Sequence, residues 1–228
     1  MIDFIAHILP EADHGCTSSA EAEAQLRLLS EAGVNAVVAA PHFDGRCMTP
    51  QGFLTARARG ERLLADIPRP EGMTVYAGAA IALTGGMHTL PGIADLTVAG
   101  TDLLLVELPP EEWNEAMLDT VLGFRSLGLR PVLAHVDRYP ARDIEGLFDL
   151  GLRGQVNADA FLGIRWLKKI RLRRWIDRGW VVALGSDLHG TVRRTARALR
   201  KSAAFLGGKR IAKLDAALTE LMHGAERI

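Results

Sequence analysis

The sequence predicts an α/β fold in which parallel strands close into a barrel, and two observations support this. The chain has 228 residues, close to the length of one such barrel, which leaves little room for two independent cores. Short apolar runs alternate with longer segments of helical period, as βα units do around a parallel sheet. We therefore expect one barrel domain over residues 1–228.

Seven short apolar runs are predicted as the strands of this barrel. They are residues 2–6, 35–40, 74–77, 103–106, 131–134, 155–156 and 180–184, of which the sixth is the weakest. The segments between them have a helical period and are predicted as helices over 18–32, 53–67, 112–126, 144–150, 163–178 and 192–205. The first helix has the clearest limits, because Ser18 precedes Glu21 in a capping arrangement and Gly33 follows as a stop signal.

The composition is that of a folded globular protein. Hydrophobic residues make up 48% of the chain and charged residues 24%, values that exclude intrinsic disorder, collagen and a coiled-coil rod. Lysine plus arginine and aspartate plus glutamate each number 27, so the formal net charge is zero. A neutral chain has no general attraction to nucleic acid or to an anionic membrane, and any basic site must be local.

The cysteines and the apolar runs indicate a cytoplasmic protein. Cys16 and Cys47 are the only cysteines and lack C-x-x-C spacing, which suits a reducing compartment. The first residues carry no positive charge ahead of an apolar stretch, and no apolar run reaches the roughly 18 residues that span a bilayer. We expect no signal peptide and no transmembrane segment, and peripheral membrane contact through a partner is compatible with this.

Histidine and acidic side chains follow the carboxyl ends of the predicted strands. These rim residues are His7, Asp13, His14, His42, Glu107, His135, Asp137, Asp187 and His189. Parallel strands of a barrel gather their carboxyl ends on one rim, so we expect these side chains to converge. One histidine at a strand end is more often a hydrogen-bonded core residue than a ligand, but five of the seven lie in this register, with His88 and His223 outside it. Such nitrogen and oxygen ligands favour a site for Zn, Mn or Fe.

Several short motifs in this order resemble a known family. They are DFIAHILP at 3–10, DHG at 13–15, PH at 41–42, LVELP at 105–109, HVDR at 135–138 and SDLH at 186–189. Over nearly its whole length the chain resembles the PHP-domain protein-tyrosine phosphatases of bacterial capsule and exopolysaccharide operons, the CpsB/YwqE type. The resemblance implies a distorted, TIM-barrel-like (β/α)7 barrel that binds up to three metal ions, usually Mn or Fe. It also implies a substrate, the phosphotyrosine segment of a partner tyrosine kinase that controls polysaccharide polymerisation.

The resemblance also assigns roles to individual residues. It implies three metal sites, formed by His7 with Asp187, by Glu107 with His135, and by His42 with His189 and the substitute ligand His14. Arg138 and Arg194 match the two arginines that hold the phosphate, and guanidinium forks suit phosphate oxygens. Asp187 has a second implied role as a proton acceptor in catalysis.

The likeness is partial, because ligand positions of the family motifs are changed. Ile5 replaces the first histidine of D-x-H-x-H, Phe43 replaces the second histidine of P-H-H, and Ala80 replaces the bridging glutamate of G-x-E. A bridging carboxylate offsets the repulsion between two dications, so its loss weakens both sites that it served. We therefore expect one or two ions rather than three. Glu11 and Asp13 lie on the same rim loop as possible substitutes.

Residues 165–178 combine a run of Lys and Arg with two Trp. The predicted apolar stripe of this helix consists of Trp166, Leu167, Ile170, Trp175 and Ile176. Our interpretation is an outer barrel helix with a solvated basic face, which the neutral net charge favours. The alternative is docking of an acidic or phosphorylated partner segment, or attachment to anionic lipid.

Three functions from different classes remain open at this point. The favoured one is a metal-dependent phosphoesterase that uses metal-activated water, with Arg138 and Arg194 on the phosphate and Asp187 as ligand or proton acceptor. The second is a pseudophosphatase that keeps the anion pocket and binds phosphate or phosphotyrosine with little turnover. The third is a mononuclear metal hydrolase of a non-phosphate substrate. None of the three involves nucleic acid.

Overall fold

Parallel strands form the centre of the computed structural model, which describes residues 1–109 and 114–228. One sheet contains β1 (Ile2–Ala6), β2 (Ala36–Ala39) and β4 (Thr74–Ala77). The other contains β3 (His42–Phe43), β5 (Ala80–Ala82), β6 (Leu103–Glu107), β7 (Arg130–Ala134), β8 (Arg153–Asn157) and β9 (Val181–Gly185). Every strand pairing of the described residues within these sheets is parallel, as the alternating pattern predicts.

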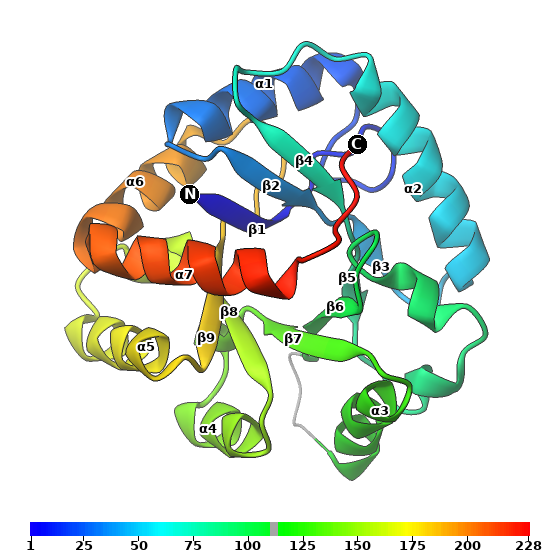
Figure 1. Cartoon of the computed structure of the whole chain (residues 1–228), viewed down its shortest axis with the longest axis vertical. Helices are drawn as coiled ribbons and strands as arrows, with labels where there is room; N and C mark the ends of the chain where they lie inside the picture. The colour runs from blue at the N-terminus through cyan, green and yellow to red at the C-terminus, as the bar shows by residue number, and fades with distance from the viewer. Residues whose placement is uncertain (110–113) are drawn as a thin grey trace.

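Two pairs of these strands, β2 with β3 and β4 with β5, each form one longer strand with a short interruption. β3 follows β2, and β5 follows β4, after gaps of two residues. Backbone hydrogen bonds continue across the gaps, from Gly78 N to Ala39 O at 2.8 Å and from Ala80 N to Pro41 O at 2.9 Å. Counting each interrupted pair as one strand, the described residues form seven strands in chain order around the ring (Figure 1).

The ring closes between the first strand and the chain that leaves the last one. Asp187 N donates to Ile5 O at 2.9 Å, and His7 N donates to Leu188 O at 3.0 Å. These bonds lie beyond the carboxyl end of β9, so closure occurs at the rim that carries the predicted site residues. The predicted distorted (β/α)7 barrel is therefore confirmed.

Helices surround the strands (Figure 1). They are α1 (Ser19–Glu31), α2 (Pro50–Ala65), α3 (Glu115–Ser126), α4 (Ala141–Asp149), α5 (Trp166–Arg178), α6 (Arg193–Leu206) and α7 (Gly208–Leu221). Short 3₁₀ turns lie at Met87–Thr89, Ile93–Leu96, Val136–Arg138 and Ala158–Phe161, and the last of these is η4. Within the described part of the chain, none of the helices has the length and apolar character needed to cross a membrane.

The last helix covers the amino end of the barrel. Figure 1 shows α7 crossing this end beside the N-terminus. Asp215 of α7 accepts a hydrogen bond from the backbone of Ile2 at 2.9 Å, and Leu221 O accepts one from Arg130 at 3.0 Å. Because α7 covers the amino end, the opposite, carboxyl rim is the end of the barrel at which a ligand can approach the polar side chains.

Buried side chains form two hydrophobic clusters, and alternation along the strands separates them. Alternate residues of β6 and β7 enter one cluster, namely Leu103, Leu105, Val132 and Ala134, together with Ile5 and Ala80. Their neighbours Leu104, Val106 and Leu133 belong to the other cluster, which contains the buried faces of the outer helices. The two positions where the family motifs have a histidine and a glutamate are thus part of one apolar cluster, and both are fully buried.

The predicted strands agree with the structure to within one or two residues, except that the weak sixth strand is longer, at Arg153–Asn157. The short strands β3 and β5 and the helix α7 were not predicted, and for the two strands the reason is that two or three residues carry no readable period. The predicted helix over 112–126 is observed as Glu115–Ser126, and the start of that prediction lies outside the described residues. α2 begins earlier than predicted, at Pro50, because Thr49 caps it.

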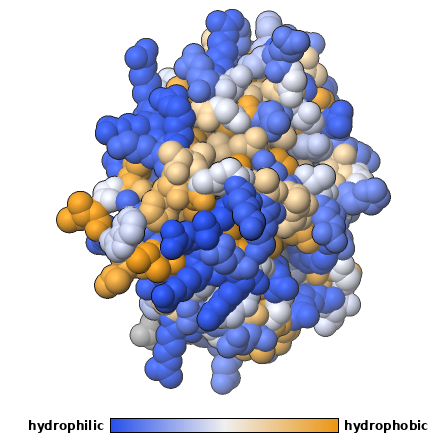
Figure 2. All heavy atoms as spheres, turned by 60° about the vertical axis from the view of Figure 1, so that its left-hand side comes forward, coloured by the Kyte–Doolittle hydropathy of each residue, from blue (hydrophilic) through white to orange (hydrophobic). Residues whose placement is uncertain are grey.

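The predicted apolar stripe of α5 is wrong at its start. Trp166 and Leu167 are 58% and 81% exposed, whereas the buried residues of the helix are Leu172, Trp175 and Ile176. The buried set has the spacing of three and four that packs against the barrel, while the first turn extends past the packed surface. Figure 2 shows hydrophobic side chains standing out beside hydrophilic ones on the side of the molecule that comes forward there.

Candidate functional site

Four imidazoles form a compact cluster at the carboxyl rim of the barrel. His7 follows β1, His42 opens β3, His189 follows β9, and His14 lies on the loop after β1. The centroid of the His7 ring lies 4.0 Å from that of His42 and 4.0 Å from that of His189, and the rings of His42 and His189 lie 5.3 Å apart. The His14 ring lies 5.0 Å from that of His42 and 5.1 Å from that of His189. We call these four residues the imidazole cluster.

Asp13 holds two members of the imidazole cluster. Its Oδ2 lies 2.8 Å from Nδ1 of His7 and 2.9 Å from Nδ1 of His42, and it accepts the backbone N–H of His42 at 2.9 Å. Burial opposes ionisation of Asp13, yet the hydrogen bonds from His42 and His7 hold its pKa well below the usual range. A carboxylate that accepts from Nδ1 leaves Nε2 as the atom available to a metal, a common arrangement around metal-binding histidines.

The loop that carries Asp13 requires a glycine. Gly15 N donates to Asp13 Oδ1 at 2.9 Å, and a Cβ at this glycine would lie 2.1 Å from Cβ of His7. No larger residue fits without moving His7, because that contact is far inside van der Waals distance. The DHG motif therefore has a steric role as well as a chemical one.

His7 has a buried nitrogen without a partner. Its Nε2 makes no hydrogen bond among the described residues and faces Asp187 Oδ1 at 3.5 Å. Burial disfavours a charged imidazole, but the hydrogen bond to Asp13 and the negative charges of Asp13 and Asp187 outweigh it and raise the pKa of His7 to about 9. A positive charge is therefore favoured at this point between two carboxylates.

A second group of side chains lies on the other half of the rim. Glu107 ends β6 and its Oε1 lies 2.9 Å from Nε2 of His135, whose Nδ1 lies 2.7 Å from Oδ1 of Asn157. Gln155 accepts the backbone N–H of His135 at 2.8 Å and donates to Asn157 Oδ1 at 2.9 Å. Burial opposes ionisation of Glu107, but its hydrogen bond with His135 holds the pKa of Glu107 below its usual range. Together with Arg138 and Asp187 we call this group the carboxylate network.

Asp187 joins the two halves of the rim. Its Oδ1 lies 3.5 Å from Nε2 of His7 and 3.9 Å from Nε2 of His135. Its Oδ2 accepts from Arg138 at 2.5 Å and from the Asn157 amide at 3.3 Å. Burial opposes its ionisation, but the nearby imidazole of His7 and the charges of His135 and Arg138 keep its pKa well below the usual range.

Two of the rim residues have a left-handed backbone. His135 and Asp187 both have φ of 54°, a conformation that non-glycine residues seldom adopt. His135 is the first residue after β7, and Asp187 is the second residue after β9. Such local strain is typical of functional sites, where the surrounding hydrogen bonds hold the residue in place.

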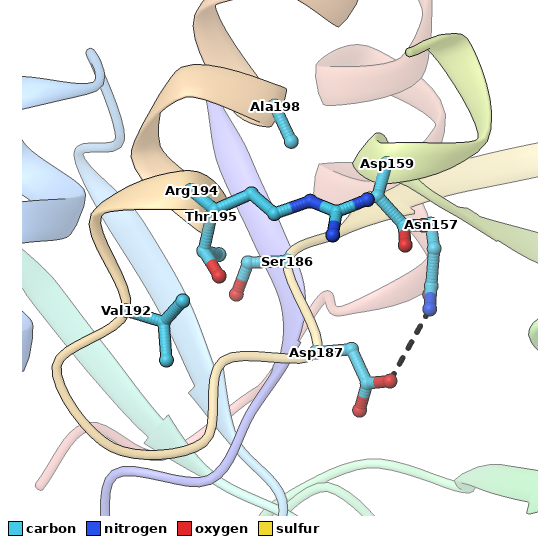
Figure 3. A pocket seen from close by; sticks show the side chains of 8 residues that line it. All are labelled: Asn157, Asp159, Ser186, Asp187, Val192, Arg194, Thr195 and Ala198. Carbon is cyan, nitrogen blue, oxygen red and sulfur yellow. Dashed lines mark hydrogen bonds between the residues drawn. The ribbon is translucent and has the colours of Figure 1, made fainter. Parts of the chain in front are cut away.

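A cavity of about 110 Å³ opens beside Asp187. It is lined by Asn157, Asp159, Ser186, Asp187, Val192, Arg194, Thr195 and Ala198. Figure 3 shows Arg194, in the first turn of α6, extending its guanidinium toward Asp159 and Asn157. We call this cavity the anion pocket, because Arg194 and the N-terminus of α6 both favour a small anion there, although the carboxylates of Asp159 and Asp187 on its wall oppose one.

The predicted metal ligands all lie in these two halves of the rim. The ligand atoms of His7, His42 and His189 fall within 4.8 Å of one another, and so do those of Asp13, His14 and His42. His14, predicted as a substitute ligand beside His42 and His189, is the exposed member, and the ring of His7 lies nearer to those two rings than the ring of His14 does. Of the possible substitutes, Asp13 reaches the cluster, whereas Glu11 pairs with Arg59 at the surface.

Two residues of the network were missed by the sequence analysis. Gln155 and Asn157 are buried polar residues two positions apart on β8, so both side chains point to the same face. Two amide residues spaced two apart in a strand were the signal in the sequence that could have predicted these site residues. The strand was weak in the sequence because these amides replace the apolar residues by which a strand is found.

Comparisons with known proteins agree with the fold. Tyrosine-protein phosphatase CpsB of Streptococcus pneumoniae is 26% identical over 206 residues, covering 83% of each chain. The putative tyrosine-protein phosphatase CapC of Staphylococcus aureus is 26% identical over 205 residues, covering 85% of this chain and 79% of its own.

Solved structures extend the comparison. One from a study of YwqE of Bacillus subtilis and CpsB of Streptococcus pneumoniae, described as unique metal-dependent tyrosine phosphatases, has a TM-score of 0.74 at 22% identity and covers 100% of this chain and 97% of its own. An inactive dihydroorotase-like domain of a CAD-like multifunctional protein from Chaetomium thermophilum has a TM-score of 0.55 at 13% identity, covering 100% and 79%. At these identities the likeness shows the fold.

The fold and the rim together define the class, an α/β barrel whose carboxyl rim carries imidazoles and carboxylates suited to a divalent cation. The chain belongs to the CpsB/CapC family of capsular polysaccharide synthesis, whose family model matches residues 1–220. The family resemblance in the sequence motifs is therefore confirmed.

Proposed function

We propose that this protein is a metal-dependent phosphoesterase that hydrolyses phosphotyrosine in a protein, the activity for which its relatives are named. The observation that carries the proposal is the buried Nε2 of His7, which has no hydrogen-bond partner in the described part of the chain and lies among imidazoles and carboxylates beside an anion pocket. In the cell, the substrate we propose is the phosphotyrosine segment of a tyrosine kinase that acts in capsule synthesis, met in the cytoplasm by the barrel of residues 1–228.

The proposed metal ligands are His7, His42, His189 and Asp187, with His14 and Asp13 beside them. Imidazole with carboxylate is a ligand set for Zn, Mn or Fe. The unpartnered Nε2 of His7 supports a cation here, because a metal would satisfy an atom that receives no hydrogen bond from residues 1–109 or 114–228. When bound, such an ion acts as a Lewis acid on the phosphoryl group and lowers the pKa of water.

The proposed ion count is one or two rather than three. Glu107 and His135 offer a second pair of ligands, but they already bond to each other at 2.9 Å. Ile5 and Ala80 lie in the apolar cluster and supply no ligand atom to either half. A third dication without a bridging carboxylate has nothing to offset its repulsion from the others.

Arg194 and Arg138 are the proposed phosphate-binding residues. Arg194 lines the anion pocket and is exposed, so its guanidinium is available to an incoming phosphate. Arg138 is paired with Asp187, which keeps it at the edge of the same site. Two guanidinium groups bind phosphate oxygens in fixed directions and hold the phosphoryl group for attack by water.

Asp187 and His189 are the proposed groups for proton movement. Asp187 remains ionised at neutral pH, so it accepts a hydrogen bond and orients the attacking water rather than giving up a proton. Burial and the charge of His7 lower the pKa of His189, which keeps this imidazole neutral and able to accept a proton or bind a metal. The anion pocket and both groups share one edge of the rim.

The proposal is tested by assaying a phosphotyrosine peptide with added Mn²⁺ or Zn²⁺ and with a chelator. We expect hydrolysis that the chelator abolishes and the metal restores. His42→Gln should lose at least about 100-fold in kcat/KM, since it removes a ligand. His223→Gln is the matched control, because that histidine is exposed and follows α7, which covers the opposite end of the barrel. Brisk hydrolysis in chelator would show that the metal mechanism is wrong.

A second candidate is a phosphotyrosine-binding protein with little turnover. The apolar cluster at Ile5 and Ala80 favours it, because the site lacks ligands that a multi-metal centre needs. The same peptide distinguishes the two candidates. The second function would be supported if the protein bound metal and peptide without hydrolysing the peptide, and if Arg194→Ala weakened the peptide binding.

A further inference from the structure

The start of α5 exposes three large apolar side chains close together in sequence. Ile164 is 98% exposed, Leu167 is 81% exposed and Trp166 is 58% exposed. Scattered exposed leucines are ordinary, but three large apolar residues within four positions form a patch that usually marks an interaction site. We call these three residues the apolar tip.

Aromatic packing holds the apolar tip in place. The ring of Trp166 meets that of Phe205 on α6 edge-on at 5.6 Å, and Phe161 packs on the same ring at 5.8 Å. The ammonium of Lys169 lies 5.7 Å over the Phe205 ring, and it also donates to Gly163 O at 2.6 Å. The tip is thus a fixed projection of the fold rather than a loose loop, so its exposure is part of the native surface.

The elements around the apolar tip are strongly basic. Residues 163–201 contain twelve Lys or Arg but only two acidic residues, in a chain whose formal net charge is zero. Neither acid is available to neutralise the surface, because Asp177 is bonded to Arg210 of α7 and Asp187 belongs to the rim site. The exposed basic residues are Arg165, Arg174, Arg178, Arg193, Arg194, Arg197, Arg200 and Lys201. Figure 2 shows long hydrophilic side chains beside the protruding hydrophobic ones.

This surface is continuous with the anion pocket. Lys168 in the first turn of α5 lies 3.3 Å from Asp137, which is two residues past His135 of the rim. On the α6 side, Val192 is 47% exposed and lines the anion pocket together with Arg194. A partner that covers the apolar tip and the basic surface therefore lies next to the pocket.

We propose that the apolar tip and its basic surround form a docking surface for an anionic lipid bilayer. Charge complementarity favours a negatively charged partner, and the exposed aliphatic and indole groups need an apolar medium, which the same bilayer supplies. Tryptophan is well suited to the membrane–water interface, and lysine and arginine stems extend from it to the headgroups. The tip projects, whereas a peptide that docks through side chains needs a groove, and a residue 98% exposed has no wall beside it.

The proposal goes beyond the proposed phosphoesterase activity and does not depend on it. Binding to the bilayer would place the anion pocket beside the membrane surface, where it would meet membrane-attached substrates. The net charge of zero is consistent with this, because the attraction is local to one side of the molecule.

The test is sedimentation of the full chain with vesicles of phosphatidylcholine, either alone or with roughly one third phosphatidylglycerol. We expect at least about tenfold tighter binding to the anionic vesicles, weakened by high salt. The double variant Ile164→Ser with Leu167→Ser should lose most of this binding, because both side chains are exposed and their removal does not disturb the core. The matched control is Leu127→Ser with Leu150→Ser, which removes two leucines that are 53% and 47% exposed elsewhere.

Other occupants would give different results, each of which overturns the proposal. If the protein does not bind the anionic vesicles but binds an acidic glutamate–tyrosine copolymer through the apolar tip, the partner is a protein. A dimer in light scattering that the tip variant dissociates would mean that a second copy covers the surface. Equal loss of vesicle binding in the tip variant and in the leucine control would show that the tip has no specific role.

Discussion

The imidazole cluster and the carboxylate network lie on the same rim but differ in how their polar atoms are satisfied. In the network, Glu107, His135, Asn157 and Asp187 are linked to one another by hydrogen bonds. In the cluster, rings stack face to face at 4.0 Å and the buried Nε2 of His7 has no partner among the described residues. The cluster holds its rings in place through Asp13 while leaving nitrogen atoms available to a ligand.

This difference indicates where a cation is needed. A buried polar atom without a partner costs free energy, and stacked imidazoles do not supply one another with hydrogen bonds here. The network is complete within the protein itself, so it can orient a ligand or a water without holding an ion. We therefore expect the tightest metal site in the imidazole cluster, with the network acting mainly as support.

The largest effect should come from removing a ligand of the cluster. His189→Ala should weaken metal binding by more than about 100-fold, because outer-shell changes alone cost roughly 10 to 100-fold. Glu107→Gln in the network should weaken it by only about tenfold, the lower end of that range. Calorimetric titration with Zn²⁺ or Mn²⁺ compares the two variants with the wild type. Equal losses in both would mean that the two halves do not differ as described.

Asn157 is expected to affect turnover more than metal binding. Its amide lies between His135 and Asp187, so Asn157→Ala should lower kcat by about 10 to 100-fold while the metal content stays unchanged. Elemental analysis and a peptide assay on the same preparation separate the two quantities. If the variant loses its metal together with its activity, the network is part of the metal site.

The motif ligands missing from the chain can be restored. Ile5→His with Ala80→Glu should add one bound ion and raise kcat by about tenfold, because a bridging carboxylate supports a pair of metals. Both positions are fully buried, so the variant should melt at a lower temperature in chelator than in Mn²⁺. Ile5→Leu, which keeps the position apolar, is the control. No extra ion at saturating metal would show that the match of these positions to the family motifs is wrong.

The last prediction concerns stability rather than the site and involves Asp3, which lies in β1. Burial raises the pKa of Asp3 to about 7, and its Oδ2 has no hydrogen-bond partner among the described residues. A folded-state pKa above the unfolded one gives stability that is present at low pH and is lost as the pH rises from about 4 through 7. Asp3→Asn stays neutral, so its stability relative to the wild type should rise by about 2 to 3 kcal/mol between pH 5 and pH 8. Urea unfolding in chelator at both pH values measures this change, and an equal difference at both would contradict it.

Much of the barrel could be predicted from the sequence because its signals are local. Runs such as 2–6 and 74–77 are observed with the predicted limits, since apolar strands and helical periods are properties of neighbouring residues. The positions of His7, His42 and His189 at strand ends were readable for the same reason. A parallel barrel has one carboxyl rim, so strand ends alone predict which residues share it.

Other features depend on contacts between distant parts of the chain, and only the tertiary structure decided them. Asp13 was one of two candidates on its loop, and its choice over Glu11 follows from where His7 and His42 meet it. The exposure of Leu167 was decided by where the barrel surface ends beneath α5, which the helical period does not encode.

The sequence by itself determined the strands, the order of the rim residues and the family motifs, including the losses at Ile5 and Ala80. The tertiary structure decided that these two losses share one apolar cluster, and that His7 rather than His14 is the central imidazole. The physical reason is that the type of each ligand side chain can be identified in the sequence itself. The geometry of the ligands depends on strands that are far apart in the chain and become neighbours only when the barrel closes.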